Sequence, residues 1–568
     1  MANSYLSSSI PLNSPYITFP DLLKRRANET PNKAAYIFID EEKKKIVLTF
    51  QDLYTKAVNF AKALVSFGFQ KGDTIGLSGR NVPEWLIANF GIQMAGGCVL
   101  CLPFCYKSSD LVRLLNSLAP VKALIIDPGL DDDNLETAMK ITNHAYSDGK
   151  TSSDDVPTLE HLILFNRSKK ASIKCTVDDL CTKEFEVDLP RLDPEDLGLI
   201  LLTSGSTGIS KAIPHSQHVL VIMCWLFVGI SESNNDSDIF YSDRAFFWGG
   251  GYPQFEMGCG ATRVTLCNSL QFPSAFDATE AVCEIIMNEK ATLAYMVPSM
   301  LEIILKRKMP LRINKIITGS SPVFSSLFEC IGEICDELQV VYGMTEIAAI
   351  ASMTFNAENK TGLNGLLSLR PLPGVEMKVT DDERFLQPVG KRGNIYIRTV
   401  KIFNGYLNHK CQPSLEDYLL KSGWMFSEDG GYVTDENTIV VEGRFKDVIE
   451  VLGRKIFPYE IEDVIKCNPS VLDVIVIPVK EKESGDRLPG AAIIYKKGCE
   501  ETKECMQNFI RKEFNITRES RMSEMMYVPQ IIHIFQEFPL MNNGKPDRRG
   551  IKQLMQESID ETKYECVF

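Results

Sequence analysis

The most informative stretch of the chain is Thr203-Ser204-Gly205-Ser206-Thr207-Gly208-Ile209-Ser210-Lys211. The apolar run Leu197–Leu202 precedes it and predicts a buried strand. Glycines let backbone N–H groups turn inward, and small hydroxyl side chains add hydrogen-bond donors without bulk. A loop of this kind suits a phosphate chain, although a Ser/Gly surface loop stays open as an alternative. It is not a Walker loop, because Gly205 and Gly208 are too close together and Ala212 follows Lys211.

Length and composition limit the possible classes of protein. A chain of 568 residues is too long for one core, so we expect at least two domains. The net charge of -13 argues against a general nucleic-acid or anionic-membrane surface. The 16 cysteines are scattered, and Cys98 and Cys101 form one CxxC among apolar neighbours. We interpret this pair as reduced core thiols rather than zinc ligands.

Signals for export or membrane insertion are weak. Met1–Tyr16 lacks the charged start and apolar run of a secretory signal. The tail Cys566-Val567-Phe568 is neither a prenylation box nor a peroxisomal Ser-Lys-Leu. The segment Trp85–Phe104 is about long enough to span a bilayer, but Asn89 and Gln93 favour a buried helix followed by a strand. We therefore expect a cytoplasmic protein with no transmembrane segment.

The first half of the chain alternates between strand and helix patterns, which indicates a mostly parallel sheet. A second alternating set runs from the phosphate loop to about residue 345. We expect residues 1–16 to be disordered and two charged stretches, Asp131–Asp133 and Ser147–Asp155, to be structureless surface insertions. The expected elements include helices at Phe19–Ala27, after the capping box at Thr49, and at Val219–Ile230, with a strand at Thr74–Ser78.

The pattern changes in the last third of the chain. Short strands at Val375–Val379 and Asn394–Arg398 predict a small antiparallel barrel or sheet. A compact α+β segment follows, with a helix near Pro458–Lys466. We place the domain boundary at Phe445/Lys446, so that residues 1–445 and 446–568 form two domains.

Four further motifs follow the first loop, and in some of them the residue types suit a particular part of a nucleotide. In Val341-Tyr342-Gly343-Met344-Thr345-Glu346 the aromatic ring suits stacking on a purine, and the carboxylate is a hard oxygen ligand for Mg²⁺. The others are the turn Thr318-Gly319-Ser320-Ser321-Pro322, a long segment from Gly423 to Glu462, and Pro539-Leu540-Met541-Asn542-Asn543-Gly544-Lys545-Pro546-Asp547-Arg548. The long segment contains Trp424-Met425-Phe426-Ser427-Glu428-Asp429 and Gly443-Arg444-Phe445-Lys446-Asp447.

These five motifs, in this order over roughly Phe19 to Arg549, resemble the adenylate-forming (AMP-binding) superfamily. That superfamily holds acyl-CoA synthetases, aryl-acid–CoA ligases and beetle-type luciferases. The resemblance implies an α/β fold. Its large N-terminal domain would have two α/β subdomains and a small β-barrel-like part, and a small mobile α+β C-terminal domain would carry the lysine loop.

The resemblance also implies roles for individual residues. Lys545, Thr345 and Glu346 would be catalytic, with Glu346 also holding magnesium, and Lys446 would be the hinge. Phe247, Trp248 and Gly249 would border the acyl pocket. Nucleotide contacts would come from Thr203, Ser204, Gly205, Ser206, Thr207, Gly208, Lys211, Gly319, Ser320, Ser321, Pro322, Tyr342, Gly343, Met344, Asp429, Arg444 and Gly453.

Several positions depart from the family pattern. Glu428 stands where a glycine usually precedes the ribose aspartate, and we expect its carboxylate to weaken ATP binding. Ser210 and Ala212 flank Lys211 in place of proline and glycine. The stretch Phe246-Phe247-Trp248-Gly249-Gly250-Gly251 lacks the histidine of many relatives, which bears on substrate choice.

The resemblance implies ATP-dependent activation of a fatty or aryl acid. The carboxylate and ATP would give an acyl-adenylate and pyrophosphate, and coenzyme A would then give acyl-CoA and AMP. ATP, Mg²⁺ and coenzyme A are thus the expected cofactors, and the protein would be a monomer or homodimer. Two alternatives stay open: a luciferase-like enzyme in which oxygen attacks the adenylate, and a binding protein that has lost turnover.

The lysine loop gives a direct prediction. A cation between two anionic reactants stabilises charge at the α-phosphorus only during adenylation. We therefore expect Lys545→Ala to slow adenylation far more than transfer of the acyl group from preformed acyl-adenylate to coenzyme A. Single-turnover assays of each half-reaction would measure this, and equal losses in both would contradict the assignment.

Overall fold

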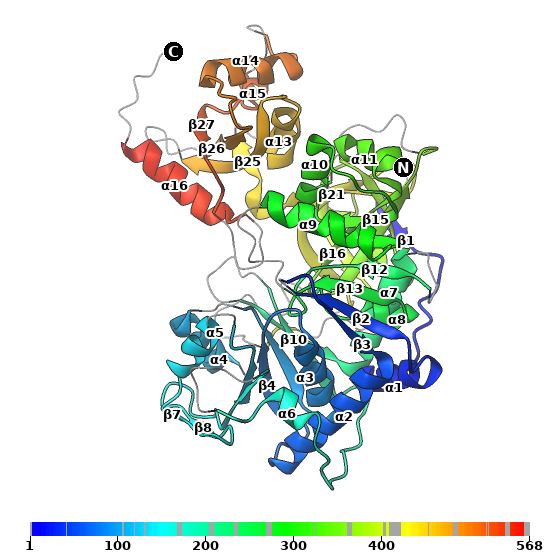
Figure 1. Ribbon diagram of the computed structural model, residues 1–568. Coiled ribbons are helices and arrows are strands. Elements are labelled where there is room, and N and C mark those ends of the chain that lie inside the picture. Colours follow the sequence, from blue (N-terminus) through cyan, green and yellow to red (C-terminus); the bar gives the residue numbers. More distant parts are fainter. Residues whose placement is uncertain are drawn as a thin grey trace.

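The protein is described by a computed structural model that covers residues 3–40, 42–104, 107–118, 120–129, 132–166, 173–203, 210–231, 237–267, 275–323, 325–359, 366–400, 405–407, 422–451, 454–480, 487–517, 520, 522–539 and 546–561. A large part with two sheets lies below a smaller C-terminal part in Figure 1. The expected α/β class, with a larger N-terminal and a smaller C-terminal part, is confirmed. None of the described helices has the length and apolar composition needed to cross a bilayer.

Six described strands form the first sheet, in the order β11-β10-β5-β4-β6-β9. All neighbours are parallel except β10 and β11, as the strand–helix alternation predicts. The strands are β4 (Thr74–Ser78), β5 (Cys98–Leu102), β6 (Val121–Ile126), β9 (His161–Leu164), β10 (Leu197–Leu202) and β11 (Ala212–Ser216). Around them lie α2 (Phe50–Ser66), α3 (Pro83–Met94), α4 (Ser108–Ser117), α5 (Asp133–Met139) and α6 (Val177–Leu180).

The segment that is long enough to span a bilayer is the buried helix α3 followed by β5. Its polar side chains Asn89 and Gln93 are buried, and the hydroxyl of Tyr252 donates to Asn89 at 3.0 Å. The thiols of Cys98 and Cys101 are buried in β5, where burial raises the pKa of both.

Fourteen strands of the described residues form the second sheet, in the order β1-β19-β20-β21-β22-β18-β17-β16-β15-β14-β12-β13-β2-β3. They are β1 (Tyr5–Ser7), β2 (Ala34–Ile39), β3 (Lys45–Thr49), β12 (Ile239–Tyr241), β13 (Thr262–Leu266), β14 (Leu293–Tyr295), β15 (Ile313–Gly319), β16 (Cys335–Met344), β17 (Ala348–Phe355), β18 (Ser368–Pro371), β19 (Glu376–Thr380), β20 (Gly393–Arg398), β21 (Met425–Val433) and β22 (Ile439–Arg444). Its helices are α1 (Phe19–Glu29), α7 (Gln217–Ser231), α8 (Phe255–Cys259), α9 (Ala275–Asn288), α10 (Pro298–Arg307) and α11 (Cys330–Glu333), with the 3₁₀ turn η1 (Ser325–Glu329).

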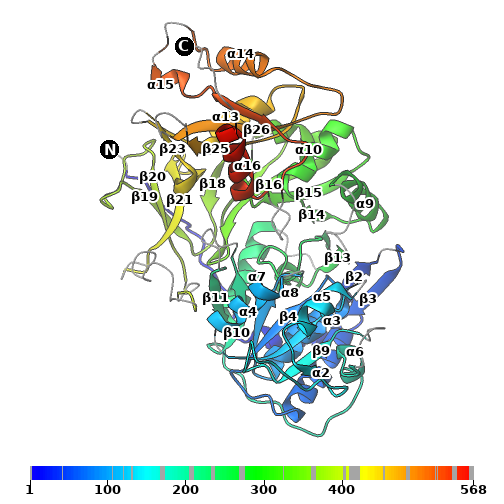
Figure 2. The same ribbon diagram turned by 90° about the vertical axis from the view of Figure 1, so that its left-hand side faces the viewer.

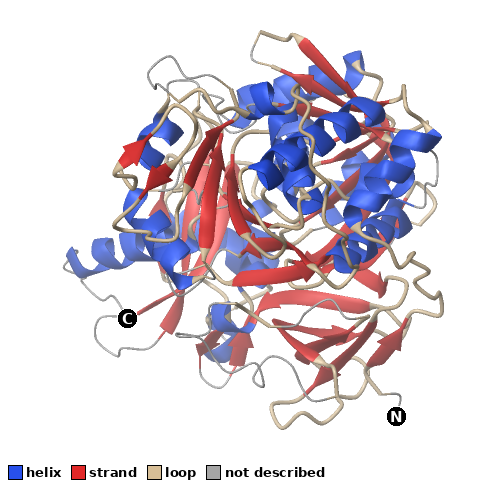
Figure 3. Ribbon diagram, turned by 90° about the horizontal axis from the view of Figure 1, so that it is seen from below, coloured by secondary structure: helices blue, strands red, loops and turns tan. Residues whose placement is uncertain are grey.

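Helix α7 explains how the two sheets share one core. It contacts β10 and β11 of the first sheet and β17 of the second. A helix that is apolar on every side needs cover on every side, which packing between two sheets provides. Figure 3 shows the strands of the large part running among helices when the molecule is seen from below.

Three expectations about this part were wrong. Residues 1–16 are not wholly disordered: β1 pairs with β19 at the sheet edge, where backbone hydrogen bonds need no apolar pattern. The two charged stretches contribute the start of α5 and the strand β8 (Thr151–Ser152), which forms a hairpin with β7 (His144–Ala145). Of the two alternatives for the last third of the chain, the barrel is wrong and the sheet is confirmed, because within the described residues β19–β22 extend the open second sheet (Figure 2).

The C-terminal part is built on a three-stranded sheet of β25 (Val471–Lys480), β26 (Arg487–Tyr495) and β27 (Ile531–Ile534). Successive side chains of a strand point to opposite faces. Accordingly, Val474 and Val476 enter one hydrophobic cluster, and Ile475 and Ile477 enter another. The other elements are η3 (Phe445–Asp447), β23 (Ile449–Val451), β24 (Arg454–Ile456), α13 (Pro458–Lys466), α14 (Lys503–Glu513), α15 (Met522–Met525) and α16 (Arg548–Glu561).

A partly buried ion pair ties α16 to α13 and β25. Glu462 Oε1 accepts hydrogen bonds from Val476 N and Arg548 Nη2, both at 2.8 Å. Arg548 Nη1 donates in turn to Val476 O at 2.9 Å. Since Arg548 is the last residue of the motif that contains Lys545, this junction fixes where that motif ends.

We predict that Glu462→Gln destabilises the C-terminal part by about 2 kcal/mol, because a hydrogen bond to a charged group contributes more than a neutral one. Hydrogen exchange of the amides in α16 and β25 would measure the loss. Glu557→Gln, on the exposed face of α16, is the matched control. Equal protection in both variants would contradict the structural role of Glu462.

Candidate active site

The predicted nucleotide contacts lie where strands of the second sheet end beside β11. Strands β15 and β16 are parallel and paired, with Gly319 opposite Val341. The turn after Gly319 and the motif at Tyr342 therefore leave the sheet at the same edge. Residues 204–208, Gly453 and Lys545 lie outside the described residues.

The ends of the phosphate loop are fixed even though its middle is not described. Thr203 N donates to Lys211 O at 3.0 Å, so the loop leaves β10 and enters β11 at adjacent points. Next to Lys211, Ala212 O accepts from Leu407 N at 3.0 Å. This contact brings a short segment from far along the chain, residues 405–407, against the loop.

Four charged side chains form a row from the phosphate loop to the ribose motif. Lys211 Nζ lies 3.6 Å from Glu428 Oε1, and Glu428 Oε2 lies 3.3 Å from Arg444 Nη1. Arg444 Nε lies 3.1 Å from Asp429 Oδ1. The hydroxyl of Tyr342 donates to Asp429 Oδ2. The structure thus brings together residues from three of the five sequence motifs.

A bulge in β21 explains why the carboxylates of two successive residues, Glu428 and Asp429, both contact Arg444. In the pairing with β20, Asn394 opposes Gly430 and Tyr396 opposes Phe426, so β21 has two extra residues there. Glu428 has φ = 61° inside this bulge. Bulges re-aim side chains that would otherwise alternate between faces. This lets Glu428 and Asp429 both contact Arg444.

Burial shapes the electrostatics of the row. Burial raises the pKa of Asp429, and the Arg444 guanidinium opposes that rise. Burial and then the Asp429 carboxylate raise the pKa of Tyr342 well above its ordinary value. Burial and the neighbouring Arg444 lower the pKa of Lys446, which also feels the charges of Glu428 and Lys211. The predicted hinge lysine therefore lies within electrostatic reach of the row.

Tyr406 joins the predicted metal ligand to the same row. Its hydroxyl donates to Glu346 Oε1 at 2.8 Å, and its ring centroid lies 4.8 Å from Lys211 Nζ. Glu346 is 6% exposed. Thr345, the residue before it, lies near His215 of β11, whose pKa burial lowers to about 3. At that value the imidazole is neutral at physiological pH.

The turn at Thr318–Pro322 is held by a residue that the sequence did not suggest. Ser320 follows Gly319 with φ = 71°, and its hydroxyl lies 2.6 Å from the Tyr295 hydroxyl. Gly319 is required because a Cβ there would lie 2.3 Å from Val341 O. Ser321 and Pro322 are exposed beyond this turn.

The predicted acyl segment lies beside β10 and the motif that contains Thr345. A Cβ added to Gly249 would lie 3.6 Å from Leu201 Cδ1 and 4.0 Å from Thr345 Cγ2. Phe247 is buried and Trp248 is half-buried. Gly249 of this segment therefore lies close to Thr345, which the resemblance implies is catalytic.

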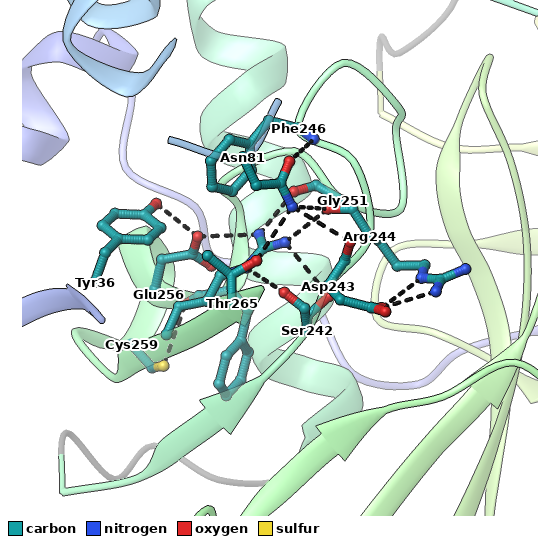
Figure 4. Close-up of polar contacts among 12 residues, drawn as sticks. Tyr36, Asn81, Ser242, Asp243, Arg244, Phe246, Gly251, Glu256, Cys259 and Thr265 are labelled. Carbon is teal, nitrogen blue, oxygen red and sulfur yellow. Dashed lines mark hydrogen bonds and ion pairs between the residues drawn. The ribbon is translucent and has the colours of Figure 1, made fainter. Parts of the chain in front are cut away.

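A buried arginine holds this segment, which has little regular structure. Arg263, on β13, donates to Gly251 O at 2.7 Å, Arg244 O at 3.1 Å and Ser242 O at 3.2 Å. Its charge is balanced by Glu256 Oε1 at 3.3 Å, which also accepts from the Tyr36 hydroxyl at 2.6 Å. Figure 4 shows these contacts around Glu256.

Asn81, which follows β4 of the first sheet, also holds the backbone of this segment (Figure 4). Its Nδ2 donates to Arg244 O at 3.0 Å, and its Oδ1 accepts from Phe246 N at 3.0 Å. Buried backbone groups outside regular elements need such side-chain partners. The segment from Ser242 to Gly251 is therefore positioned by Arg263 and Asn81.

The sequence signals for these supporting residues were weak or absent. Tyr406 follows a glycine in a stretch without a specific motif, and Asn81 and Tyr295 belong to ordinary strand and loop patterns. Arg263 is the only charged residue in Met257–Leu270, and a charge in such an uncharged stretch is a usable hint of a buried ion pair.

Comparison with known proteins agrees with this geometry. The family described as AMP-binding enzyme matches residues 23–407. This chain belongs to that family. The resemblance that the five motifs suggest is thus confirmed.

Curated relatives of this AMP-binding enzyme have low sequence identity to it, but the alignments cover several hundred residues. It is 24% identical over 566 residues to a long-chain-fatty-acid–CoA ligase of Bacillus subtilis (strain 168), with 94% of each chain covered. It is 28% identical over 336 residues to 4-coumarate–CoA ligase-like 4 of Oryza sativa subsp. japonica, with 57% of this chain and 58% of that protein covered.

Solved structures confirm the fold. The structure of anthranilate CoA ligase AuaEII in complex with anthranoyl-AMP is similar with a TM-score of 0.79 and 21% identity, covering 96% of this chain and 98% of that one. ATP-bound MatB from Rhodopseudomonas palustris gives a TM-score of 0.75 at 19% identity, covering 96% and 100%.

The residues present fit a magnesium ion only in combination with a nucleotide. In the part of the chain that the structure describes, no group of three or more His, Cys, Asp and Glu side chains could hold a metal alone. Mg²⁺ is usually bound by one or two carboxylates together with substrate phosphates. Glu346 would supply one such carboxylate, because Tyr406 contacts both Glu346 and Lys211, the lysine at the end of the phosphate loop.

We predict that Arg263→Met destabilises the large part by about 3–5 kcal/mol, because it leaves a fully buried carboxylate unpaired. The matched control is Arg312→Met, which breaks the exposed pair with Asp336 and should cost less than about 1 kcal/mol. Urea unfolding followed by tryptophan fluorescence would compare them. Similar losses would show that Arg263 contributes no more than a surface arginine.

Proposed function

We propose that this AMP-binding enzyme is an ATP-dependent acid–CoA ligase. In the first step a carboxylate oxygen attacks the α-phosphorus of ATP, and pyrophosphate leaves. In the second step the thiolate of coenzyme A attacks the acyl carbon, and AMP leaves. The first step converts a poor electrophile, the free carboxylate, into a mixed anhydride that the thiol can attack.

One observation carries the proposal: the connected row that runs from Glu346 through Tyr406 and Lys211 to the ribose motif. An ATP molecule needs a hard carboxylate for its Mg²⁺, cations for its phosphates and an acceptor for its ribose hydroxyls. The row supplies these groups in that order. Mg²⁺ bound there would neutralise phosphate charge during transfer.

Each residue then has a proposed task. Asp429 would accept hydrogen bonds from the ribose, with Tyr342 and Arg444 holding the carboxylate in place. Thr345 would contact the α-phosphate next to the acyl segment. Lys545 would approach the α-phosphate for the first step, and rotation of residues 446–568 about Lys446 would remove it for the second.

We propose an apolar substrate, either a fatty or an aryl acid. The acyl segment presents Phe247 and Trp248 and no histidine, and Gly249 leaves room beside Thr345. The names of the relatives span both classes, because one is a long-chain-fatty-acid–CoA ligase and another is 4-coumarate–CoA ligase-like.

ATP–pyrophosphate exchange with purified protein, Mg²⁺ and a panel of fatty and aryl acids tests the proposal. Exchange that depends on one class of acid supports adenylation and defines the substrate. Formation of AMP and thioester after coenzyme A is added then supports the ligase, whereas oxygen uptake or light supports a luciferase-like reaction. No exchange with any acid contradicts the proposal.

The ribose carboxylate gives a quantitative prediction. Asp429→Asn removes the charge that pairs with Arg444 and weakens the ribose acceptor, so we expect the KM for ATP to rise roughly 10- to 100-fold. The KM for the acid should change little. Steady-state kinetics of pyrophosphate release would measure both constants.

Asp435→Asn is the control for this variant. Asp435 is exposed in the turn between β21 and β22, the same hairpin that carries Asp429. Its substitution makes the same change in charge away from the row. A rise in the KM for ATP in both variants, or in neither, would argue against a ribose contact by Asp429.

A further inference from the structure

Glu428 lies between two cations of the predicted nucleotide site. Its two carboxylate oxygens lie 3.6 Å from Lys211 Nζ and 3.3 Å from Arg444 Nη1. These are the cation at the end of the phosphate loop and the cation of the ribose motif. Lys446 also feels the charge of Glu428. One carboxylate thus neutralises part of a cluster of three cations.

The backbone at Glu428 is poorly suited to this residue. Its φ of 61° lies in the left-handed region, where a Cβ crowds the backbone and glycine is favoured. The bulge between β20 and β21 imposes this conformation. A side chain that persists in such a place does so because its contacts offset the strain.

We propose that Glu428 is an internal competitor for the nucleotide's phosphates. In the absence of nucleotide it pairs with Lys211 and Arg444. The polyphosphate of a nucleoside triphosphate must then displace the carboxylate from Lys211 before that lysine can bind a phosphate oxygen. This inference rests on the proposed function and adds a residue that sets affinity for the phosphates, separately from the base and ribose.

The exchange differs from simple repulsion between the carboxylate and ATP. Lys211 cannot pair fully with the Glu428 carboxylate and with a phosphate of ATP at the same time. Part of the free energy of ATP binding is therefore used to break the pair between Lys211 and Glu428. A ligand without phosphates leaves the pair with Lys211 intact. Adenosine should therefore be insensitive to Glu428, whereas ATP should be sensitive to it.

Isothermal titration of ATP and of adenosine to the full-length protein tests the proposal. In Glu428→Gln the side chain keeps its size and loses its charge, and we expect ATP to bind about tenfold more tightly. Adenosine should bind within twofold of the original affinity. Glu436→Gln makes the same change of charge in the exposed turn of the same hairpin, and we expect it to alter neither affinity.

Glu428→Gly is the second variant, and it guards against a folding defect. Glycine accepts φ = 61° without strain, so this protein should fold at least as well as the original while lacking the carboxylate. Tighter ATP binding in both variants, with adenosine unchanged, supports the competitor. Unchanged or weaker ATP binding, or equal tightening for adenosine, overturns it.

The same experiment separates this inference from the proposed function. If the unchanged protein binds ATP and catalyses pyrophosphate exchange, but the two Glu428 variants bind ATP no more tightly, only the competitor is wrong. If neither the unchanged protein nor the variants bind ATP, the proposed function and the competitor are both wrong.

Discussion

The site depends on how Arg444 joins two carboxylates of the bulged strand β21. A single guanidinium contacts both Glu428 and Asp429, and through them it reaches Lys211 on one side and Tyr342 on the other. An arginine can do this because its planar fork carries several donors at fixed angles. Without the bulge the two carboxylates would point to opposite faces of the sheet.

A buried ion pair, Arg263 with Glu256, holds the segment from Ser242 to Gly251 next to the site. The pair of Arg263 and Glu256 is fully buried, and its role differs from that of the partly buried row of Lys211, Glu428, Arg444 and Asp429. Arg263 satisfies backbone carbonyls of a segment that has few partners of its own, so the pair fixes an irregular wall next to Thr345. Desolvating two charges is costly, and here the hydrogen bonds to the backbone offset part of that cost.

Much of the fold could be predicted from local patterns. The strand Leu197–Leu202 and the helix Pro458–Lys466 have the expected bounds, and α7 is buried as its apolar surface indicates. The failure at the N-terminus has a physical reason: Tyr5–Ser7 forms a strand because the edge of β19 offers hydrogen-bond partners. Pairing partners distant in sequence leave no local pattern.

The sequence by itself determined the family, because five motifs with specific residue types kept their order along the chain. It also indicated which residue types would meet a nucleotide, since phosphates, ribose and Mg²⁺ each need a particular chemistry. Only the tertiary structure decided which side chains touch. Tyr406 reaches Glu346 across 60 positions, and Glu428 meets Lys211 across more than two hundred, because strand pairing and a bulge set these distances.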